Sequence, residues 1–343
     1  MTRTGKRPSF SSVETRPTRI AEGVLVRKSL LPGPMPFPIV VEPAMEGVDV
    51  VSWLSHYRED LQQMLVETGA VLFRAFDITT VAGFERAATA IAPELLEYKE
   101  RSTPRTLVAG RIYTSTEYPP HQRIAFHNEF SYSLTWPMKI AFCCITAPEE
   151  GGETPLADSQ AVFESLPHEV RDEFAARKVR YVRNYGSGID LPWEEAFQTT
   201  EREQVEEHCR KAEVCFEWRG GDRLRTWQVR EAVARHPVTG ATVWFNQAHL
   251  FHIASHSPEV RRSLVETFGT DDLPRNAYFG DGGEIPAAML QSIHEAYERN
   301  AVAFPWRAGD LLVADNMRMA HGRMPYRGAR SILVAMGEPC THA

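Results

Sequence analysis

Two side chains that can bind a metal lie two positions apart in the strand-like segment IAFHNEFSY, residues 124–132: His127 and Glu129. Side chains at positions i and i+2 of a strand point to the same face, whereas Asn128 between them points to the other. Two ligands do not hold a divalent metal firmly, so a third is expected elsewhere in the chain. The best candidate is His321, which lies just past the apolar run LLVAD and before a turn with proline and glycine.

Two histidines and one carboxylate make the facial triad of non-heme Fe(II) oxygenases, which leaves open positions for a co-substrate and O2. Such an enzyme must also hold a dicarboxylate co-substrate. Arg330 follows His321 by nine residues, and its planar, permanently charged fork suits a carboxylate. Thr154, in the glycine-rich segment GGETP, can add a hydroxyl donor.

These patterns also have ordinary explanations. A histidine two residues before an acid arises easily by chance in a chain with 12 histidines and 45 acidic residues, and an ion pair explains it equally well. A rival group, His249, His252 and His256, has a spacing that would share one helix face, as in zinc sites. It follows a strand-like run and lacks an H-E-x-x-H glutamate, so pocket-lining or strand-end roles are favoured over a zinc hydrolase. The sequence has no G-x-S-x-G, P-loop or dinucleotide-binding pattern.

The elements that must position these residues alternate between helical and β-rich stretches. A helix is expected over 52–69, with Ser52 as N-cap and Gly69 at its end, followed by a buried strand at 70–76 and a second helix after it. Short β-rich runs fill 105–147, and helices return between 159 and 216, where Thr200 and Glu203 form a capping box. Strands at 225–249 and from 311 onward are separated by helices, the first of them capped by Ser257.

This order predicts one α+β domain over residues 45–343. Residues 1–44, basic at the start and proline-rich towards the end, are expected to form an extended, partly disordered lead-in. Residues 184–230 are aromatic-rich and contain glycines, so they are expected to form a helical insert, which could act as a lid over the site.

Composition excludes several classes of protein. With 343 residues, 43% of them hydrophobic, and a net charge of -7, the chain fits a soluble globular protein and not a generic nucleic-acid or anionic-membrane binder. No apolar run approaches the length of a membrane-spanning helix. Five cysteines without a C-x-x-C pair favour reduced thiols and a cytoplasmic location.

Four ordered segments resemble the TauD/TfdA-like family of Fe(II)/2-oxoglutarate-dependent oxygenases, and within it the SyrP-like and clavaminate synthase-like branches. They are YTSTEYPPHQRIAFHNEFSYSLTWPMKIAFCC, GGETPLADSQAVFESLP, VWFNQAHLFH and DNMRMAHGRMPYRGARSILVAM, and the resemblance runs from about residue 45 to residue 338. It implies a double-stranded β-helix (jelly-roll) core with flanking helices, and Fe(II), 2-oxoglutarate and O2 as cofactor and co-substrates. His127, Glu129 and His321 match the iron ligands.

The same resemblance places Arg330 and Thr154 at the positions that bind 2-oxoglutarate, with Arg323 as the second candidate for the arginine. Glu129 retains a carboxylate where halogenases have a small residue, so hydroxylation is implied, with desaturation or cyclisation available at the same site. The implied substrate is a small molecule, an amino acid or its derivative, free or tethered to a carrier protein, in specialised metabolism. An oligomer is compatible with the sequence, and a non-catalytic jelly-roll binding protein is the rival from another class. Residues considered for substrate contact are Tyr113, Ser115, Asn128, Ser131, Trp244 and Asn246.

Overall fold

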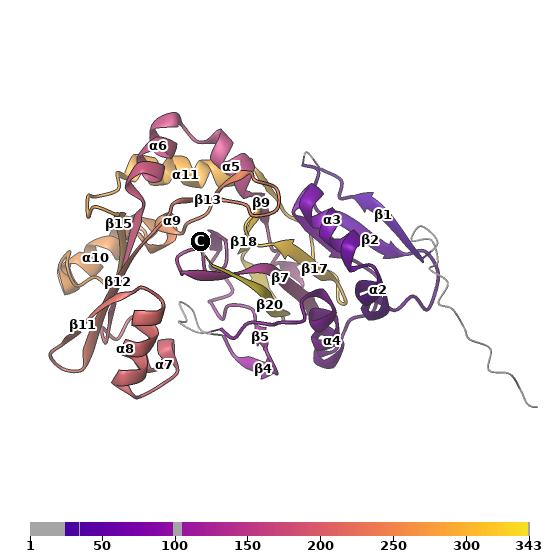
Figure 1. Ribbon diagram of the computed structural model, residues 1–343, viewed down its shortest axis with the longest axis horizontal. Coiled ribbons are helices and arrows are strands. Elements are labelled where there is room, and N and C mark those ends of the chain that lie inside the picture. Colours follow the sequence, from indigo (N-terminus) through magenta and orange to yellow (C-terminus); the bar gives the residue numbers. More distant parts are fainter. Residues whose placement is uncertain (1–24, 34, 99–104, 342–343) are drawn as a thin grey trace, which may run out of the picture.

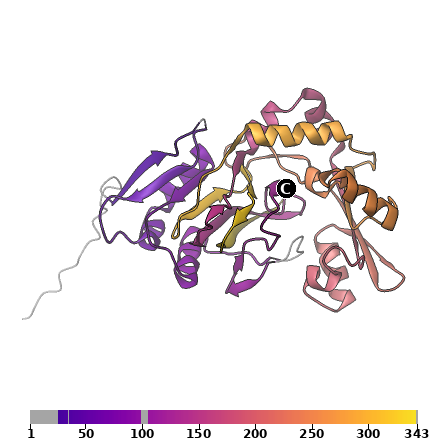
Figure 2. The same ribbon diagram turned by 180° about the vertical axis from the view of Figure 1, so that it is seen from behind.

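The computed structural model describes residues 25–33, 35–98 and 105–341. A large sheet forms the middle of the molecule, and Figures 1 and 2 show the N-terminal elements at one end and residues 193–230 at the other. Residues 1–24, the start of the expected lead-in, lie outside the described residues. No described helix is long and apolar enough to cross a membrane. All five cysteines are free thiols, as expected.

The large sheet has eight strands in the order β1-β2-β3-β17-β7-β20-β5-β4. All neighbours are antiparallel except β2 and β3, which are parallel. The proline-rich lead-in is extended and contributes two of these strands. Their bounds are β1 Val26–Leu30, β2 Ile39–Pro43, β3 Ala70–Phe73, β4 Leu107–Ala109, β5 Ile112–Thr114, β7 Thr135–Thr146, β17 Leu311–Asp315 and β20 Ser331–Thr341.

A second, four-stranded sheet faces the large one and completes the jelly roll. Its order is β16-β9-β18-β6, with β6 Ile124–His127, β9 Leu156–Asp158, β16 Ala301–Val302 and β18 Met319–Arg323. Phe142 and Val334 from the large sheet and Leu156 and Ala320 from the small one belong to one buried apolar cluster. The two inner faces therefore form a continuous core, and the predicted jelly roll is confirmed.

The outer face of the large sheet is covered by α2 Val50–His56, α3 Arg58–Thr68 and α4 Val81–Ile91. The single helix expected over 52–69 is wrong: the chain breaks at Tyr57. The N-cap is Asp49, whose carboxylate accepts a hydrogen bond from the Ser52 N–H at 2.8 Å, because Asp49 precedes the apolar pair that starts the helix. Gly69 ends α3 in the left-handed conformation, as expected.

The remaining elements lie beyond the jelly roll. Helices are α5 Ser159–Ser165, α6 His168–Arg177, α7 Trp193–Phe197, α8 Arg202–Lys211, α9 Ala248–Phe251, η1 Ile253–Ser255, α10 Pro258–Phe268 and α11 Ala287–Arg299. The expected capping box at Thr200 and Glu203 is wrong, since α8 begins after Glu201 without a side-chain cap. The Ser257 cap of α10 is confirmed. Strands are β8 Glu150–Gly151, β10 Val179–Tyr185, β11 Cys215–Arg219, β12 Arg223–Arg230, β13 Val233–Arg235, β14 Thr242–Trp244, β15 Arg275–Phe279 and β19 Tyr326–Arg327.

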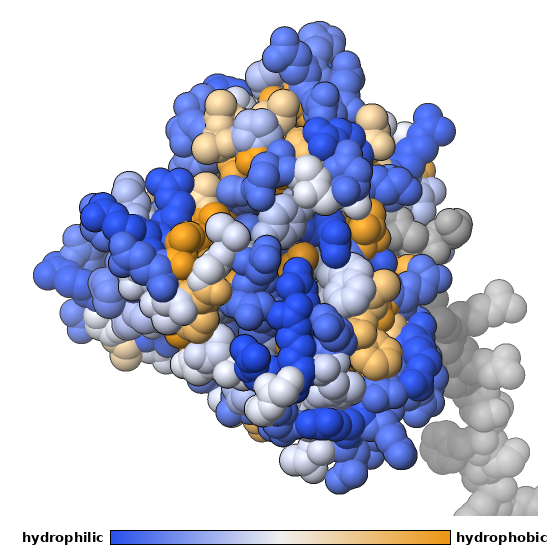
Figure 3. Space-filling model, turned by 90° about the vertical axis from the view of Figure 1, so that its left-hand side faces the viewer, coloured by the Kyte–Doolittle hydropathy of each residue, from blue (hydrophilic) through white to orange (hydrophobic). Residues whose placement is uncertain are grey.

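The segment 184–230 has a small apolar core of its own. Tyr185, Trp193, Val205 and Leu224 are among its buried members, and α7, α8 and β11 surround them. The end of the molecule that carries this segment has a mainly hydrophilic surface with separate apolar groups (Figure 3). The Gln198 side chain ties the segment to the jelly roll by donating to the carbonyl of Tyr98 at 2.8 Å.

Candidate metal and co-substrate site

Two paired strands and one turn bring together three side chains that could hold a metal ion. His127 ends β6 and lies opposite His321 of β18 in the sheet, with ring centroids 4.5 Å apart. Glu129 lies just past the end of β6 and not within a strand, in a turn where Phe130 has a φ of 57°. One ligand atom from each of the three side chains lies within 4.8 Å of the other two. Among the described residues, this is the only group of three histidine, cysteine or acidic side chains close enough to hold a metal.

Both histidines favour the neutral form, which can bind a cation through a ring nitrogen. His127 Nδ1 lies 2.9 Å from the carbonyl oxygen of Ala125, and because a carbonyl only accepts, Nδ1 carries the proton and Nε2 keeps its lone pair. Burial lowers the pKa of His127, against the opposing effect of Glu129. Burial also lowers the pKa of His321 well below 6.5, and the neighbouring His127 and Arg105 add to this effect. Two neutral imidazoles and one carboxylate are a donor set that suits Fe(II).

Asn316 fixes the turn that carries Glu129. Its Oδ1 accepts the backbone N–H of Glu129 at 2.7 Å, and its Nδ2 donates to the carbonyls of Glu129 and Pro137, each at 2.9 Å. Asn128 in turn donates to the Asn316 carbonyl at 2.7 Å and to the Ser159 hydroxyl at 3.0 Å. Asn128 is fully buried, so it positions the backbone and does not reach the metal position.

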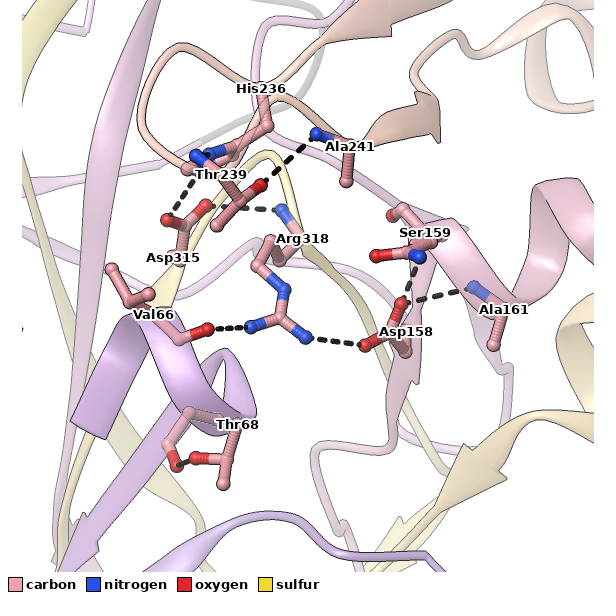
Figure 4. A network of polar contacts seen from close by, with 12 residues as sticks. Val66, Thr68, Asp158, Ser159, Ala161, His236, Thr239, Ala241, Asp315 and Arg318 are labelled. Carbon is pink, nitrogen blue, oxygen red and sulfur yellow. Dashed lines mark hydrogen bonds and ion pairs between the residues drawn. The ribbon is translucent and has the colours of Figure 1, made fainter. Parts of the chain in front are cut away.

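A second polar network holds the start of β18, which carries His321 (Figure 4). The Arg318 guanidinium pairs with Asp158 at 3.0 Å and also donates to the Val66 carbonyl of α3. Asp315 accepts the backbone N–H of Arg318 through one oxygen, at 3.1 Å, and contacts His236 Nε2 through the other, at 2.9 Å. The turn between β17 and β18 is thereby tied to three other parts of the fold.

A cavity beside the three side chains contains the predicted co-substrate residues. Its lining includes Thr154 and Arg330 together with both histidines. Arg330 Nε donates to the Gly152 carbonyl at 2.9 Å, and Nη1 donates to the Ser115 hydroxyl at 3.3 Å. Burial and the nearby Arg323 lower the pKa of Arg330 to about 10, so the guanidinium stays charged at neutral pH.

Thr154 and the glycine turn before it shape the same wall. The Thr154 hydroxyl accepts from Trp306 Nε1 at 3.1 Å, which leaves its own proton available for a ligand. Gly152 has a φ of 72°, and a Cβ there would lie 3.1 Å from Arg330 Cδ. Glycine therefore allows both the turn and the close approach of the arginine.

Arg323, the second candidate arginine, has a structural role. Although it lines the cavity, its guanidinium donates to the carbonyls of Tyr118, Pro119 and Gln122 at 2.7–2.9 Å. These bonds hold the loop before β6 against the buried Arg323 side chain. Arg330 is thus better placed to meet a ligand carboxylate.

Arg105 is the site residue that the sequence did not indicate. Its Nη2 lies 2.6 Å from Glu129 Oε2, and both side chains are about 95% buried. Its guanidinium also lies over the Tyr98 ring, 4.6 Å from the centroid. Arg105 is separated from Glu129 by 24 positions and belongs to no motif, so only the fold reveals this contact.

The residues considered for substrate contact divide clearly. Ser115 alone lines the cavity. The Tyr113 hydroxyl accepts a hydrogen bond from the Tyr98 N–H. The Asn246 side chain donates to the Ala232 carbonyl and accepts from the Ala248 N–H. Ser131 and Trp244 are buried in the interior. These four, like Asn128, serve packing and local hydrogen bonding.

The rival histidine group does not form a metal site within the described residues. His249 Nε2 lies 2.8 Å from the Phe126 carbonyl, and His252 Nδ1 accepts the Ala254 N–H at the start of η1. His252 therefore caps the short helix η1 and not a strand end, and His249 is buried against β6.

Buried His249 is expected to make the metal-free protein acid-sensitive. Burial lowers its pKa to about 4, below the unfolded value of about 6.5. Above pH 6.5 the side chain is neutral in both states. As the pH falls from 6.5 to 4, the unfolded state takes up the proton first. The free energy of unfolding therefore decreases by about 1.4 kcal/mol per pH unit, and the total decrease is about 3 kcal/mol. Urea denaturation of the metal-free protein at several pH values measures this slope, and His249→Gln should reduce it; an equal slope in both proteins would contradict the assignment.

Comparison with known proteins agrees with this geometry. The sequence model of the taurine catabolism dioxygenase TauD, TfdA family matches residues 32–336. The chain belongs to the TauD/TfdA family. It is 41% identical to the dapdiamide synthesis protein DdaC of Enterobacter agglomerans over 300 residues, covering 88% of this chain and 91% of that protein. It is 30% identical to a clavaminate synthase-like protein of Arabidopsis thaliana over 329 residues, covering 88% and 93%.

Solved structures share the TauD-type fold. PvcB from Pseudomonas aeruginosa has a TM-score of 0.56 at 16% identity, over 96% of this chain and 95% of that one. AAD-2, in complex with Mn(II) and N-oxalylglycine, has a TM-score of 0.52 at 15% identity, over 92% and 100%. Membership of the TauD/TfdA family makes this chain a non-heme dioxygenase that depends on Fe(II) and 2-oxoglutarate and consumes O2, acting on a small-molecule substrate.

Proposed function

We propose that this TauD/TfdA-family oxygenase hydroxylates an aliphatic C–H of an amino acid or an amino-acid-derived molecule in specialised metabolism. His127, Glu129 and His321 hold the iron, and Arg330 and Thr154 hold 2-oxoglutarate. The observation that carries the proposal is the convergence of the three ligand atoms within 4.8 Å, next to a cavity lined by Arg330 and Thr154.

Each of these residues has a defined task. The iron supplies the oxidising chemistry when bound. His127 presents Nε2 because its Nδ1 proton is held by the Ala125 carbonyl, and the Asn316 side chain fixes the backbone of Glu129. Arg330 and Thr154 orient the distal carboxylate of 2-oxoglutarate, and Phe142, whose ring lies 5.0 Å from that of His321, excludes water.

The retained Glu129 supports hydroxylation over halogenation, because a full carboxylate occupies the position where a halide would otherwise bind. The similarity to a dapdiamide synthesis protein supports an amino-acid-related substrate, free or tethered to a carrier protein. We further propose that the 184–230 insert serves as a lid. The Gln198 bond to Tyr98 supports this role, since Tyr98 stacks on Arg105 beside the metal position.

Anaerobic titration of the protein with Fe(II) and 2-oxoglutarate tests the proposal. A metal-to-ligand charge-transfer band should appear, and admission of O2 should then release succinate. A panel of amino acids, added before O2, should include members that perturb the band and raise succinate release. Absence of both the band and succinate would contradict the proposed function.

Replacement of Arg330 by glutamine should weaken 2-oxoglutarate binding by about 10- to 100-fold, because charge-assisted hydrogen bonds to the carboxylate are lost. Fe(II) affinity should stay unchanged, since Arg330 does not belong to the ligand group. The matched control is Arg327→Gln, three residues earlier, where the exposed side chain pairs with Glu150. Titration of the charge-transfer band with 2-oxoglutarate measures the affinity of both variants for this co-substrate. Equal affinities in the two variants would mean that Arg330 does not bind 2-oxoglutarate.

A further inference from the structure

A buried tryptophan contacts the threonine that is assigned to 2-oxoglutarate. Trp306 is 5% exposed, and its Nε1 donates to the Thr154 hydroxyl at 3.1 Å. An indole N–H can only donate a hydrogen bond, so the Thr154 oxygen is the acceptor and the hydroxyl proton points away from Trp306. Because Thr154 lines the cavity, this proton can be donated to a carboxylate that binds there.

The backbone of Thr154 is held on both sides, whereas its side chain can still turn. The carbonyls of the residues before and after it accept the backbone N–H groups of Met324 and Gly322, at 3.0 and 3.1 Å. A threonine side chain has more than one favourable rotamer, and its hydroxyl group also rotates. The Trp306 N–H selects among these arrangements, because only those that turn the oxygen towards the indole keep this buried donor hydrogen-bonded.

A buried ion pair holds the loop that carries Trp306. Arg74, which follows β3, binds both carboxylate oxygens of Asp310 at 2.7 and 3.0 Å, and the two side chains are 9% and 1% exposed. Arg74 also donates to the carbonyl of Pro305 at 3.1 Å. Asp310 also accepts the backbone N–H of Arg307 at 2.8 Å. The pair therefore holds the residue before Trp306 and the residue after it, which limits the positions that the indole can take.

We propose that Trp306 is a positioning residue for 2-oxoglutarate. Its N–H keeps the Thr154 hydroxyl in the orientation that donates to the distal carboxylate, in the cavity that also contains Arg330. A donor that is already oriented loses less freedom when the ligand binds, so affinity is gained without a new contact. Trp306 does not belong to the cavity lining, so it acts through Thr154. The inference rests on the proposed function, which assigns Thr154 to 2-oxoglutarate.

Replacement by phenylalanine tests this role, because it keeps an aromatic ring and removes the N–H. In the anaerobic titration of the charge-transfer band, Trp306→Phe should weaken 2-oxoglutarate binding by about 3- to 10-fold, the effect of one neutral hydrogen bond. Trp53→Phe is the matched control, because Trp53 is 2% exposed and belongs to the apolar cluster on the outer face of the large sheet. Its affinity for 2-oxoglutarate should stay unchanged. Equal affinities in the two variants would overturn the inference.

A double-mutant cycle with Thr154→Val separates positioning from a general effect on packing. Thr154→Val alone should weaken 2-oxoglutarate binding by about 10- to 100-fold, since a hydrogen bond to a charged group is lost. If Trp306 acts through the hydroxyl, adding Trp306→Phe to Thr154→Val should change the affinity by less than about twofold. The same loss of affinity in both backgrounds would show that Trp306 acts only through packing and would overturn the inference.

The same titrations distinguish failure of the inference from failure of the proposed function. If the wild-type protein forms no charge-transfer band, the proposed function is overturned and this inference with it. Unchanged affinity in Thr154→Val would remove Thr154 from the co-substrate site and would also overturn the inference. A loss of affinity in Thr154→Val without one in Trp306→Phe would overturn the inference alone.

The indole N–H signal in the nuclear magnetic resonance spectrum gives a readout that leaves Trp306 in place, also if Trp306→Phe does not fold. In the Zn(II)-loaded protein with isotope-labelled tryptophan, the Trp306 signal is the one of seven that moves most in Thr154→Val. Saturating 2-oxoglutarate should shift this signal downfield in the wild-type protein, because a hydroxyl that donates to a carboxylate becomes a stronger acceptor. An unchanged Trp306 signal on 2-oxoglutarate binding would overturn the inference.

Discussion

Replacement of His321 by alanine is expected to abolish turnover and to weaken Fe(II) binding by more than about 100-fold. Loss of a residue that only hydrogen-bonds to a metal ligand typically costs about 10- to 100-fold in metal affinity. His321 offers a ligand atom itself, so its loss should cost more. The fold should persist, since removal of a neutral buried imidazole leaves no uncompensated charge. Metal content after dialysis against Fe(II), together with succinate release, measures the effect.

His252→Ala is the matched control for this substitution. His252 lies outside the three-ligand group, and its Nδ1 accepts only the Ala254 N–H at 3.0 Å. Loss of this cap should cost about 1 kcal/mol of stability and leave metal binding unchanged. The opposite pattern, with metal lost in His252→Ala and kept in His321→Ala, would restore the zinc-site alternative.

Replacement of Asn316 by alanine is expected to damage both stability and the metal site. The substitution removes the partners of the Glu129 N–H and of two carbonyls, all buried. Each unsatisfied buried group costs about 1–3 kcal/mol, so a total loss of about 3–5 kcal/mol is expected. Because the Glu129 turn is then no longer fixed, Fe(II) affinity should also fall by about 10- to 100-fold.

Asn300→Ala controls for the loss of an asparagine side chain. Asn300 donates to the Ser165 hydroxyl at 2.9 Å and to the Ala296 carbonyl at 2.8 Å, at the half-exposed end of α11. Its substitution should change the free energy of unfolding by less than about 1 kcal/mol and leave metal binding intact. Denaturant unfolding measures the free energy of unfolding of both variants. A similar decrease in the two variants would mean that Asn316 has no special role in the turn.

The fold could be predicted where local patterns and the family resemblance agreed. Buried strands such as β3 and β17 are continuous apolar runs, and α10 carries its cap and stop signals in its own sequence. Helix boundaries were less predictable, because Ser52 and Asp49 are both good caps and only the break at Tyr57 shows which helix is being capped. Cap preference is a local property, whereas the choice among caps depends on how α2 and α3 pack.

The site could be predicted to the extent that its residues have chemically distinctive side chains. His127, Glu129 and His321 converge as expected, even though Glu129 lies beyond the strand. Asn316 and Arg105 were not indicated, because an asparagine or a lone arginine is common at the surface and nothing local marks a buried one. Their roles depend on contacts across 187 and 24 positions of the chain, which only the folded structure defines.

The position of β20 has a consequence for how the protein is made. This strand, residues 331–341, inserts between β7 and β5, which are encoded some two hundred positions earlier. A growing chain therefore exposes the unpaired edges of β7 and β5 until β20 has left the ribosome, and pairing between such distant strands is slow. His321 is synthesised only just before β20, so iron capture is a late event in biosynthesis. Iron loading can then report that the strands made late, β18 and β20, have joined the two sheets.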